Sequence, residues 1–497
     1  MYRPIIIIST IIFLTLAQDG QRPTRIEKTF ENPSELDALK RSLERNPFEV
    51  WYFKDEFKSL EDMSITPEIY NKEAVERTTT KDRLQNVMKK ALLGQNIGVT
   101  IMGGSISAGG GLINDYSDLR GIYYRVFIDW WQKAIQPFTG SNIELRNLAV
   151  GGTGSDFFSF CYKTFMKPQD SMDLIFLEFS VSDYAILRNS QSPMALSLER
   201  LTRQLLKEKN SSAVMFVNFV PANLYIPVCD NLENNGQTML AWHYGITSFS
   251  IRDSLCPNTR NKKFAAMFSS DQNHPSILAH AQIAMMIINS VRDALRRSIE
   301  SSEQGFHHLP SHDLPRSVYF IDDQGVIPDP LCYTLITPDI TSKFFNPSLS
   351  VKEIANVGFK QVKDVSIGFD RISSGALNPE RSRTDWYGGW EAEKENSILK
   401  LQIDLPFGGL LSVNETRGVV IVIRSNGYGG KAEVWLEKYK PGIVVDTYST
   451  LEQTRLSTVA HQVVSGSHVL NIKVVRAGKF TLCGVLARAF WLEPMPS

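Results

Sequence analysis

One serine follows a glycine pair at the end of an apolar run, where its hydroxyl could act as a nucleophile. The run covers residues 97–102, and Gly103-Gly104 precedes Ser105. A nucleophilic serine needs an exposed hydroxyl, a base and nearby backbone N–H donors. The same segment could be an ordinary glycine-rich turn. It has neither the Gly-Lys-Ser/Thr of a phosphate-binding loop nor the GxGxxG fingerprint of a dinucleotide site.

A histidine with a carboxylate three residues before it supplies the base that such a serine needs. Asp271 and His274 are followed by Pro275. In a loop, this spacing lets the carboxylate reach one ring nitrogen while the other nitrogen faces a nucleophile. An isolated Asp-x-x-His could be only a loop or a helix cap. Together with Ser105 upstream, it favours a catalytic site formed by Ser105, Asp271 and His274.

The elements that must position these residues alternate between strand and helix patterns. Short apolar runs, typical of strands covered on both faces, lie at residues 97–102, 143–150, 174–179 and 213–219. Helical patterns cover residues 119–135, 193–209 and 276–298, the first with a strong amphipathic stripe. This alternation predicts a parallel α/β sheet. Its carboxyl edge is where ligands bind in such folds, so we expect Ser105 there.

Beyond a polar stretch at residues 299–317, the apolar period changes to two. Strand candidates divided by Gly, Asn and Pro are residues 419–424, 432–438, 444–450, 469–475 and 480–487. They predict an all-β sandwich or jelly roll. We therefore expect a signal peptide at 1–17, a lead-in at 18–94, an α/β domain at 95–298, a linker at 299–329 and a β-sandwich domain at 330–490.

The composition is that of a folded protein and gives no sign of a nucleic-acid partner. Lys plus Arg and Asp plus Glu are 53 each among 497 residues, so the formal net charge is zero. Nucleic-acid binders usually carry a basic face, which neutrality argues against. The 43% of hydrophobic residues excludes a mostly disordered chain.

The first residues have the pattern of a secretory signal peptide. A short apolar run at 5–16 ends in Thr15-Leu16-Ala17, with small residues suited to cleavage after Ala17. The run is shorter than the roughly 20 residues that span a bilayer, although an uncleaved signal anchor is an alternative. We expect a secreted or luminal protein with no transmembrane span after signal removal. Sequons at Asn210 and Asn414 fit that compartment.

Five cysteines also fit an oxidising compartment, and their odd number leaves at least one unpaired or bonded elsewhere. We expect pairs Cys229–Cys256 and Cys332–Cys483, with Cys161 as a buried thiol, although spacing alone does not fix connectivity. The sequence has no Cys-x-x-Cys pair, and we expect neither a metal site nor a cofactor.

Four blocks of the sequence resemble the SGNH (GDSL-like) hydrolase superfamily over about residues 95–297. They are Gly103-Gly104-Ser105, the segment 147–152, the segment 179–183 and Asp271-x-x-His274-Pro275. The resemblance implies a three-layer α/β/α, flavodoxin-like fold and ester hydrolysis through an acyl-enzyme. The lead-in and the β region lie outside it.

The resemblance also implies a role for each site residue. Ser105 would be the nucleophile, His274 the base and then the acid, and Asp271 the group that orients His274. The backbone N–H groups of Ser105 and Gly152 would form part of the oxyanion hole. Ser182 stands where the family usually has an asparagine that completes the hole. Its hydroxyl can donate but is shorter, and losing one such donor costs on the order of 100- to 1000-fold in rate.

Three functions remain open at this point. The first is a serine esterase that hydrolyses an O-acyl glycan or a lipid acyl ester. The second is a weakly active or inactive glycan-binding protein on the same fold, because Ser182 departs from the family pattern. The third is an O-acyltransferase, which uses the same triad but passes the acyl group to an alcohol.

Overall fold

The computed structural model describes residues 33–55, 78–112, 119–187, 196–208, 212–220, 237–252, 267–271, 274–303, 314–319, 330–336, 345–362, 388–406 and 416–489. The predicted signal peptide, the sequon asparagines Asn210 and Asn414, Cys229 and Cys256 lie outside these residues. Within them, no helix combines the length and apolar character needed to cross a membrane.

A parallel sheet forms the centre of the first part of the chain. Its strands are β1 (Ile97–Gly103), β2 (Ile143–Asn147), β3 (Leu174–Glu178), β4 (Ala213–Asn218) and β5 (Thr247–Ser250). They are ordered β2-β1-β3-β4-β5, and every neighbouring pair is parallel. The chain direction across the sheet therefore reverses between β1 and β3, which is the position where such sheets bind ligands. The short strand β5 was not predicted.

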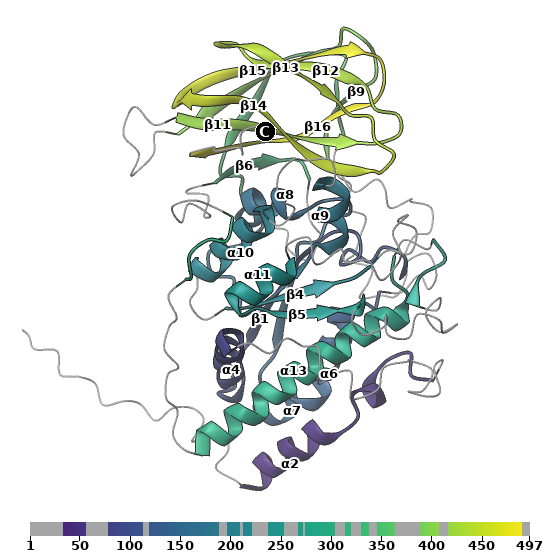
Figure 1. The fold of residues 1–497 in the computed structure, drawn as a ribbon, viewed down its shortest axis with the longest axis vertical. Helices are drawn as coiled ribbons and strands as arrows, with labels where there is room; N and C mark the ends of the chain where they lie inside the picture. The colour runs from purple at the N-terminus through teal and green to yellow at the C-terminus, as the bar shows by residue number, and fades with distance from the viewer. Residues whose placement is uncertain are drawn as a thin grey trace, which may run out of the picture.

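Helices cover both faces of this sheet (Figure 1). One face packs against α4 (Thr78–Leu92), α6 (Tyr123–Ala134) and α13 (Ile277–Glu303). The other packs against α8 (Ser155–Cys161), α10 (Leu196–Glu208) and α11 (Gln237–Tyr244). Alternate strand side chains serve the two faces, so the central strands β1, β3 and β4 are mostly apolar and buried along their whole length. The predicted three-layer α/β/α fold is confirmed.

Shorter elements complete this part of the molecule. They are α2 (Pro33–Glu44), η1 (Pro47–Val50), α7 (Gln136–Thr139), η3 (Tyr162–Phe165) and α9 (Ser180–Leu187). The amphipathic stripe predicted at 119–135 is α6, and its aromatic side chains are buried against the sheet. The last helix, predicted to end at 298, continues to Glu303.

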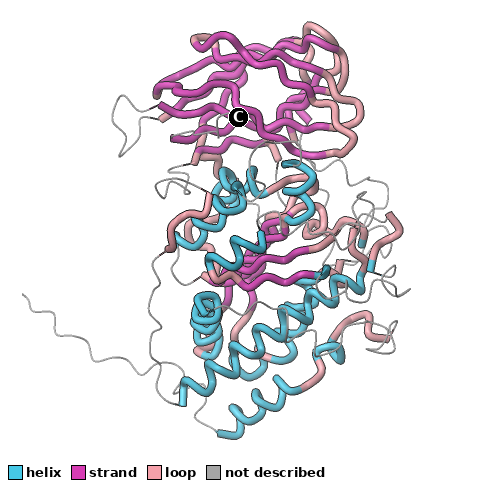
Figure 2. Tube along the Cα trace, viewed as in Figure 1, coloured by secondary structure: helices cyan, strands magenta, loops and turns pink. Residues whose placement is uncertain are grey.

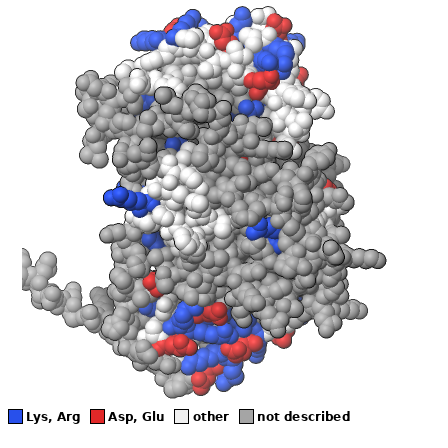
Figure 3. Space-filling model, viewed as in Figure 1, with Lys and Arg blue, Asp and Glu red and all other residues white. Residues whose placement is uncertain are grey.

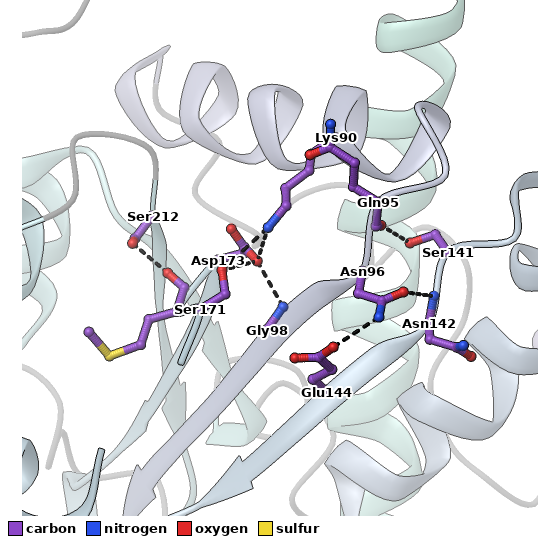
Figure 4. A network of polar contacts seen from close by, with 11 residues as sticks. Lys90, Gln95, Asn96, Gly98, Ser141, Asn142, Glu144, Ser171, Asp173 and Ser212 are labelled. Carbon is purple, nitrogen blue, oxygen red and sulfur yellow. Dashed lines mark hydrogen bonds and ion pairs between the residues drawn. The ribbon is translucent and has the colours of Figure 1, made fainter. Parts of the chain in front are cut away.

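The edge of the sheet opposite the strands' carboxyl ends is fixed by a polar network around Asp173 (Figure 4). The Asp173 carboxylate accepts hydrogen bonds from Lys90 Nζ at 2.7 Å, the Gly98 amide at 2.8 Å and Ser171 Oγ at 2.7 Å. Gly98 must be a glycine, because a Cβ there would lie 1.9 Å from the Ser171 carbonyl oxygen. This network ties the start of β1 to the start of β3.

The remainder of the described chain forms two antiparallel sheets packed face to face (Figure 2). The first has the order β13-β12-β15-β10-β7, and the second has β14-β11-β16-β9-β8 with β6 also paired to β16. Their bounds are β6 Leu331–Thr334, β7 Ser350–Val357, β8 Lys360–Val362, β9 Gly389–Ala392, β10 Ile398–Leu405, β11 Thr416–Ser425, β12 Lys431–Leu436, β13 Tyr439–Asp446, β14 Gln453–Val464, β15 Gly466–Arg476 and β16 Phe480–Ala489. An apolar core between the sheets confirms the predicted β-sandwich.

The sandwich and the α/β part share a second apolar core. Val420, Val422 and Leu486 of the sandwich lie in the same buried cluster as the side chains of α8 and α10. In Figure 1 the sandwich sits directly over α8 and α9. In the view of Figure 3, acidic and basic side chains lie intermixed at both ends of the molecule.

A disulfide joins the two parts and corrects the predicted pairing. Cys161, at the end of α8, is bonded to Cys332 on β6, with 5.3 Å between their Cα atoms. Cys483 is buried and forms no disulfide with a described residue. The predicted Cys332–Cys483 bond is wrong because Cys332 lies opposite Leu486 in the β6–β16 ladder, and Cys483 lies further along. The expectation of a buried Cys161 thiol is wrong because its sulfur is bonded to that of Cys332.

Candidate active site

Ser105 lies in the turn that follows β1, at the carboxyl edge of the sheet. The turn is tight: the Gly110 amide donates to the Ser105 carbonyl at 2.7 Å, and the Ala108 amide donates to the Gly104 carbonyl at 3.1 Å. Gly104 is required by a close approach, because a Cβ there would lie 2.1 Å from Ser182 Oγ. The glycine pair thus lets the loop after β1 meet the start of α9.

His274 and Asp271 face Ser105 from the loop before α13. Ser105 Oγ is 2.8 Å from His274 Nε2, and His274 Nδ1 is 2.7 Å from Asp271 Oδ2. The loop is closed by backbone hydrogen bonds from Ser269 to the His274 carbonyl and from Ser276 to the Met267 carbonyl. The structure therefore brings together the three residues predicted from sequence, over a separation of 169 positions between Ser105 and His274.

The other oxygen of Asp271 is held by two donors. Asp271 Oδ1 accepts from Ser269 Oγ at 2.6 Å and from the His274 amide at 3.0 Å. The side chains of His274 and Asp271 are 17% and 29% exposed, so the dyad is reachable from solvent. Sequence reasoning missed Ser269. A serine two residues before the aspartate is too common to single out without the loop geometry.

Two glycines fit against the imidazole. A Cβ on Gly110 would lie 2.7 Å from His274 Nε2, and one on Gly111 would lie 2.6 Å from His274 Cβ. Gly111 also has φ +83°, which favours glycine. The run of three glycines at 109–111 was the available signal, and it was not interpreted.

The segments that carry the predicted oxyanion groups approach the loop that contains Ser105. Gly151 is close enough that a Cβ on it would lie 3.8 Å from Ser105 Cβ, and Gly152 follows with φ +67°. Neither the Ser105 amide nor the Gly152 amide donates a hydrogen bond to another described residue. The Ser182 side chain is buried beside Gly104, and its hydroxyl has no hydrogen-bond partner among the described residues. Within the described part of the chain, these two N–H groups and this hydroxyl therefore have no hydrogen-bond acceptor.

Asn147 links the loops after β1 and β2. Its amide nitrogen donates to the Tyr124 hydroxyl at 2.8 Å and to the Ser107 carbonyl at 3.3 Å. Its oxygen accepts from the Ala149 amide at 3.0 Å. A buried amide with these partners fixes the segment leading to Gly151 and Gly152 relative to the loop that contains Ser105.

Two buried carboxyls lie beneath the site. Glu178 Oε2 accepts from the Ser107 amide at 3.1 Å, and Asp183 accepts from the Ser155 amide and hydroxyl at 2.8 and 2.7 Å. Burial raises the pKa of Glu178 to about 8, against the lowering effect of its hydrogen bonds. Burial likewise raises the pKa of Asp183 to about 8. Both groups favour the neutral form in the folded protein at pH 7.

Glu178→Gln is expected to weaken the pH dependence of stability. The ordinary pKa of 4.5 applies to the unfolded chain, so the folded protein binds the extra proton between pH 4.5 and about 8. The free energy of unfolding should therefore fall as pH rises through this window, by up to about 1.4 kcal/mol per pH unit for this one group. Urea unfolding at pH 5, 6, 7 and 8 measures the slope, which the variant should flatten. Glu144→Gln, at an exposed position of β2, is the control and should keep the wild-type slope; an equal slope in Glu178→Gln would contradict the assignment.

Among the described residues, no three His, Cys, Asp or Glu side chains are grouped so that they could hold a metal ion.

No protein-family model and no curated protein sequence matches this chain. Solved structures do match it. One is a two-domain esterase (CEX) active on acetylated mannans, co-crystallised with mannopentaose, with a TM-score of 0.58 and 19% identity over 85% of this chain and 99% of that one. A second structure, described as a two-domain esterase (CEX) active on acetylated mannans, gives a TM-score of 0.56 and 18% identity over 83% and 96% of the two chains. Because these matches span both parts, the chain shares the whole two-domain fold, an α/β/α layer structure joined to a β-sandwich.

Proposed function

We propose that this protein is a secreted serine esterase of the SGNH type that hydrolyses an acyl ester on a glycan. The observation that carries the proposal is the continuous contact from Ser105 Oγ to His274 Nε2 at 2.8 Å and from His274 Nδ1 to Asp271 Oδ2 at 2.7 Å. Such a chain of contacts is what activates a serine hydroxyl. The order of the four sequence blocks and the strand order of the sheet support membership of the SGNH group.

In the proposed reaction, Ser105 Oγ attacks the acyl carbonyl and His274 Nε2 takes its proton. The negative charge that develops on the carbonyl oxygen is stabilised by the Ser105 and Gly152 N–H groups and by the Ser182 hydroxyl. His274 then gives its proton to the leaving alcohol oxygen, and the acyl group stays on Ser105. A water molecule attacks this acyl-enzyme, His274 accepts a proton from the water, and that proton returns to Ser105 as the acid is released.

An acetylated glycan is the substrate class that we favour over a lipid ester. The two solved structures with the same two-domain arrangement are esterases active on acetylated mannans. The test is the release of acetate from acetylated mannan, compared with hydrolysis of 4-nitrophenyl acetate and of a long-chain nitrophenyl ester. Preference for the long chain would overturn the glycan assignment but leave the esterase assignment standing.

The same assays distinguish the esterase from two alternative functions. An inactive glycan-binding protein would bind mannan and release no acetate from any ester. An O-acyltransferase would form an acylated sugar when a free sugar acceptor is added, and mass spectrometry of the products would detect it.

Ser182→Ala is expected to lower kcat by about 100-fold with little change in KM. The hydroxyl lies beside Gly104 and lacks another described partner, so we assign it as the third oxyanion donor, and removal of one donor typically has this effect. Steady-state kinetics with 4-nitrophenyl acetate measure it. An unchanged kcat would mean that Ser182 only fills space.

A further inference from the structure

A buried arginine of the β-sandwich reaches the backbone of the candidate oxyanion loop. Arg424 lies near the end of β11 and is 3% exposed. Its Nη1 donates to the Gly151 carbonyl at 3.0 Å and to Thr454 Oγ1 at 3.3 Å, and its Nε is 3.4 Å from Glu452 Oε1. A guanidinium from the second domain therefore binds the residue just before Gly152.

The following carbonyl is also held by the sandwich. The Thr454 amide donates to the Gly152 carbonyl at 2.6 Å. The approach is so close that a Cβ on Gly152 would lie 2.8 Å from both Arg424 Nη1 and the Glu452 carbonyl oxygen. The carbonyl groups of Gly151 and Gly152 thus both accept hydrogen bonds from residues of the sandwich.

The Gly151 carbonyl and the Gly152 N–H belong to one planar peptide group. In a trans peptide they point in opposite directions, so a donor that fixes the carbonyl also fixes the direction of the N–H. Gly151 lies next to Ser105, because a Cβ on Gly151 would lie 3.8 Å from Ser105 Cβ. A hydrogen bond from a cation to the carbonyl also polarises the peptide group and strengthens its N–H as a donor.

A Gly-Gly peptide needs such a constraint more than other peptides do. Glycine adopts positive and negative φ with similar ease, so the peptide between two glycines can rotate with little steric cost. Gly152 has φ +67° in this structure. Rotation of the 151–152 peptide would exchange the directions of the Gly152 N–H and the Gly151 carbonyl, and a carbonyl oxygen in place of the N–H would repel an oxyanion.

We infer that Arg424 is a positioning residue that orients the Gly152 N–H toward the oxyanion, which makes the β-sandwich part of the catalytic apparatus. This inference rests on the esterase function proposed above. It assigns a catalytic role to a domain that would otherwise be expected only to hold the substrate.

The kinetic test compares Arg424→Met with the wild type on 4-nitrophenyl acetate. We expect kcat to fall about 10- to 100-fold and KM to change less than about threefold, because a misdirected donor affects the transition state more than substrate binding. Inhibition by a methylboronic acid, which forms a tetrahedral adduct on serine, should weaken by a similar factor. Arg424→Lys keeps a positive charge and N–H donors on one nitrogen, and it should recover part of the loss.

Arg417→Met is the matched control. Arg417 is also a fully buried arginine of β11, near the other end of the strand, so its replacement reports the cost of losing a buried cation from the sandwich. We expect it to keep the wild-type kcat whatever its effect on the unfolding temperature. Equal losses of kcat in both variants would overturn the inference in favour of a general structural effect.

A crystal structure of Arg424→Met provides a readout that does not depend on turnover. We expect the 151–152 peptide to take a second orientation in the variant. An unchanged peptide would overturn the inference even if kcat falls. If the wild type and Ser105→Ala are equally inactive on all esters, the proposed function fails; if the wild type is active and Arg424→Met keeps its kcat, only the positioning role fails.

Discussion

Replacing Ser105 by alanine is expected to lower ester hydrolysis at least about 1,000-fold. The Oγ atom is the only group placed 2.8 Å from His274 Nε2, among the described residues, that could form the acyl-enzyme. Removal of a triad nucleophile leaves only the rate supplied by binding and the oxyanion donors. The measurement is acetate release from acetylated mannan and hydrolysis of 4-nitrophenyl acetate, at equal concentrations of wild type and variant.

Ser171→Ala is a matched control for this variant. Ser171 is also a hydrogen-bonded serine, but it lies in the Asp173 network at the opposite edge of the sheet. It should keep the wild-type kcat. Hydrolysis that survives in Ser105→Ala would remove Ser105 as the nucleophile, and with it the acyl-enzyme mechanism.

Asp271→Asn is expected to lower kcat by about 100- to 10,000-fold while leaving the fold intact. The carboxylate accepts from His274 Nδ1 at 2.7 Å, and it holds the ring so that Nε2 faces Ser105. An asparagine can present its amide nitrogen instead, which favours the wrong tautomer of the imidazole. The change is nearly isosteric, so the circular dichroism spectrum and the unfolding temperature should stay close to those of the wild type.

Two further variants test whether the loss of kcat is specific to the Asp271 carboxylate. Ser269→Ala removes only the hydroxyl that donates to Asp271 Oδ1 at 2.6 Å, and it should cost much less, about 10-fold. Asp293→Asn alters an aspartate of α13 that pairs with Arg296 and should have no effect on kcat. Unchanged turnover in Asp271→Asn would exclude Asp271 from the site.

The triad could be predicted because each member lies beside a local signal. Ser105 follows an apolar run and two glycines, and Asp271 and His274 are three residues apart before a helix. Strand order then places both segments at the same edge of the sheet. The chemistry of the residue types and the sheet's topology are sufficient for this inference.

The supporting contacts could not be predicted, because they depend on packing between distant segments. Arg424 is 273 positions from Gly151, and nothing in its own segment distinguishes it from any other arginine at a strand end. The contact of Gly110 with the His274 ring is of the same kind. Only the folded chain shows which backbone groups these residues meet.

The errors in the β region also have physical causes. The strand predicted at 444–450 ends at Asp446, because Thr447 turns back to accept from the Asn426 amide. The strand at 453–464 was missed because its buried positions do not alternate, and its pairing with β11 contains register shifts. A search for alternating apolar and polar residues therefore does not reveal this strand.

The covalent bond from Cys161 to Cys332 and the apolar cluster around Val420 and Leu486 constrain how this molecule can evolve. A recombination event that exchanged the β-sandwich for an unrelated domain would expose apolar side chains of α8 to solvent. It would also leave Cys161 without its disulfide partner. The two parts of the chain are therefore expected to be inherited together. Substitutions on one side of the contact between them should require compensating substitutions on the other side. Residues in this contact should accordingly diverge more slowly than residues on the outer surface of the molecule.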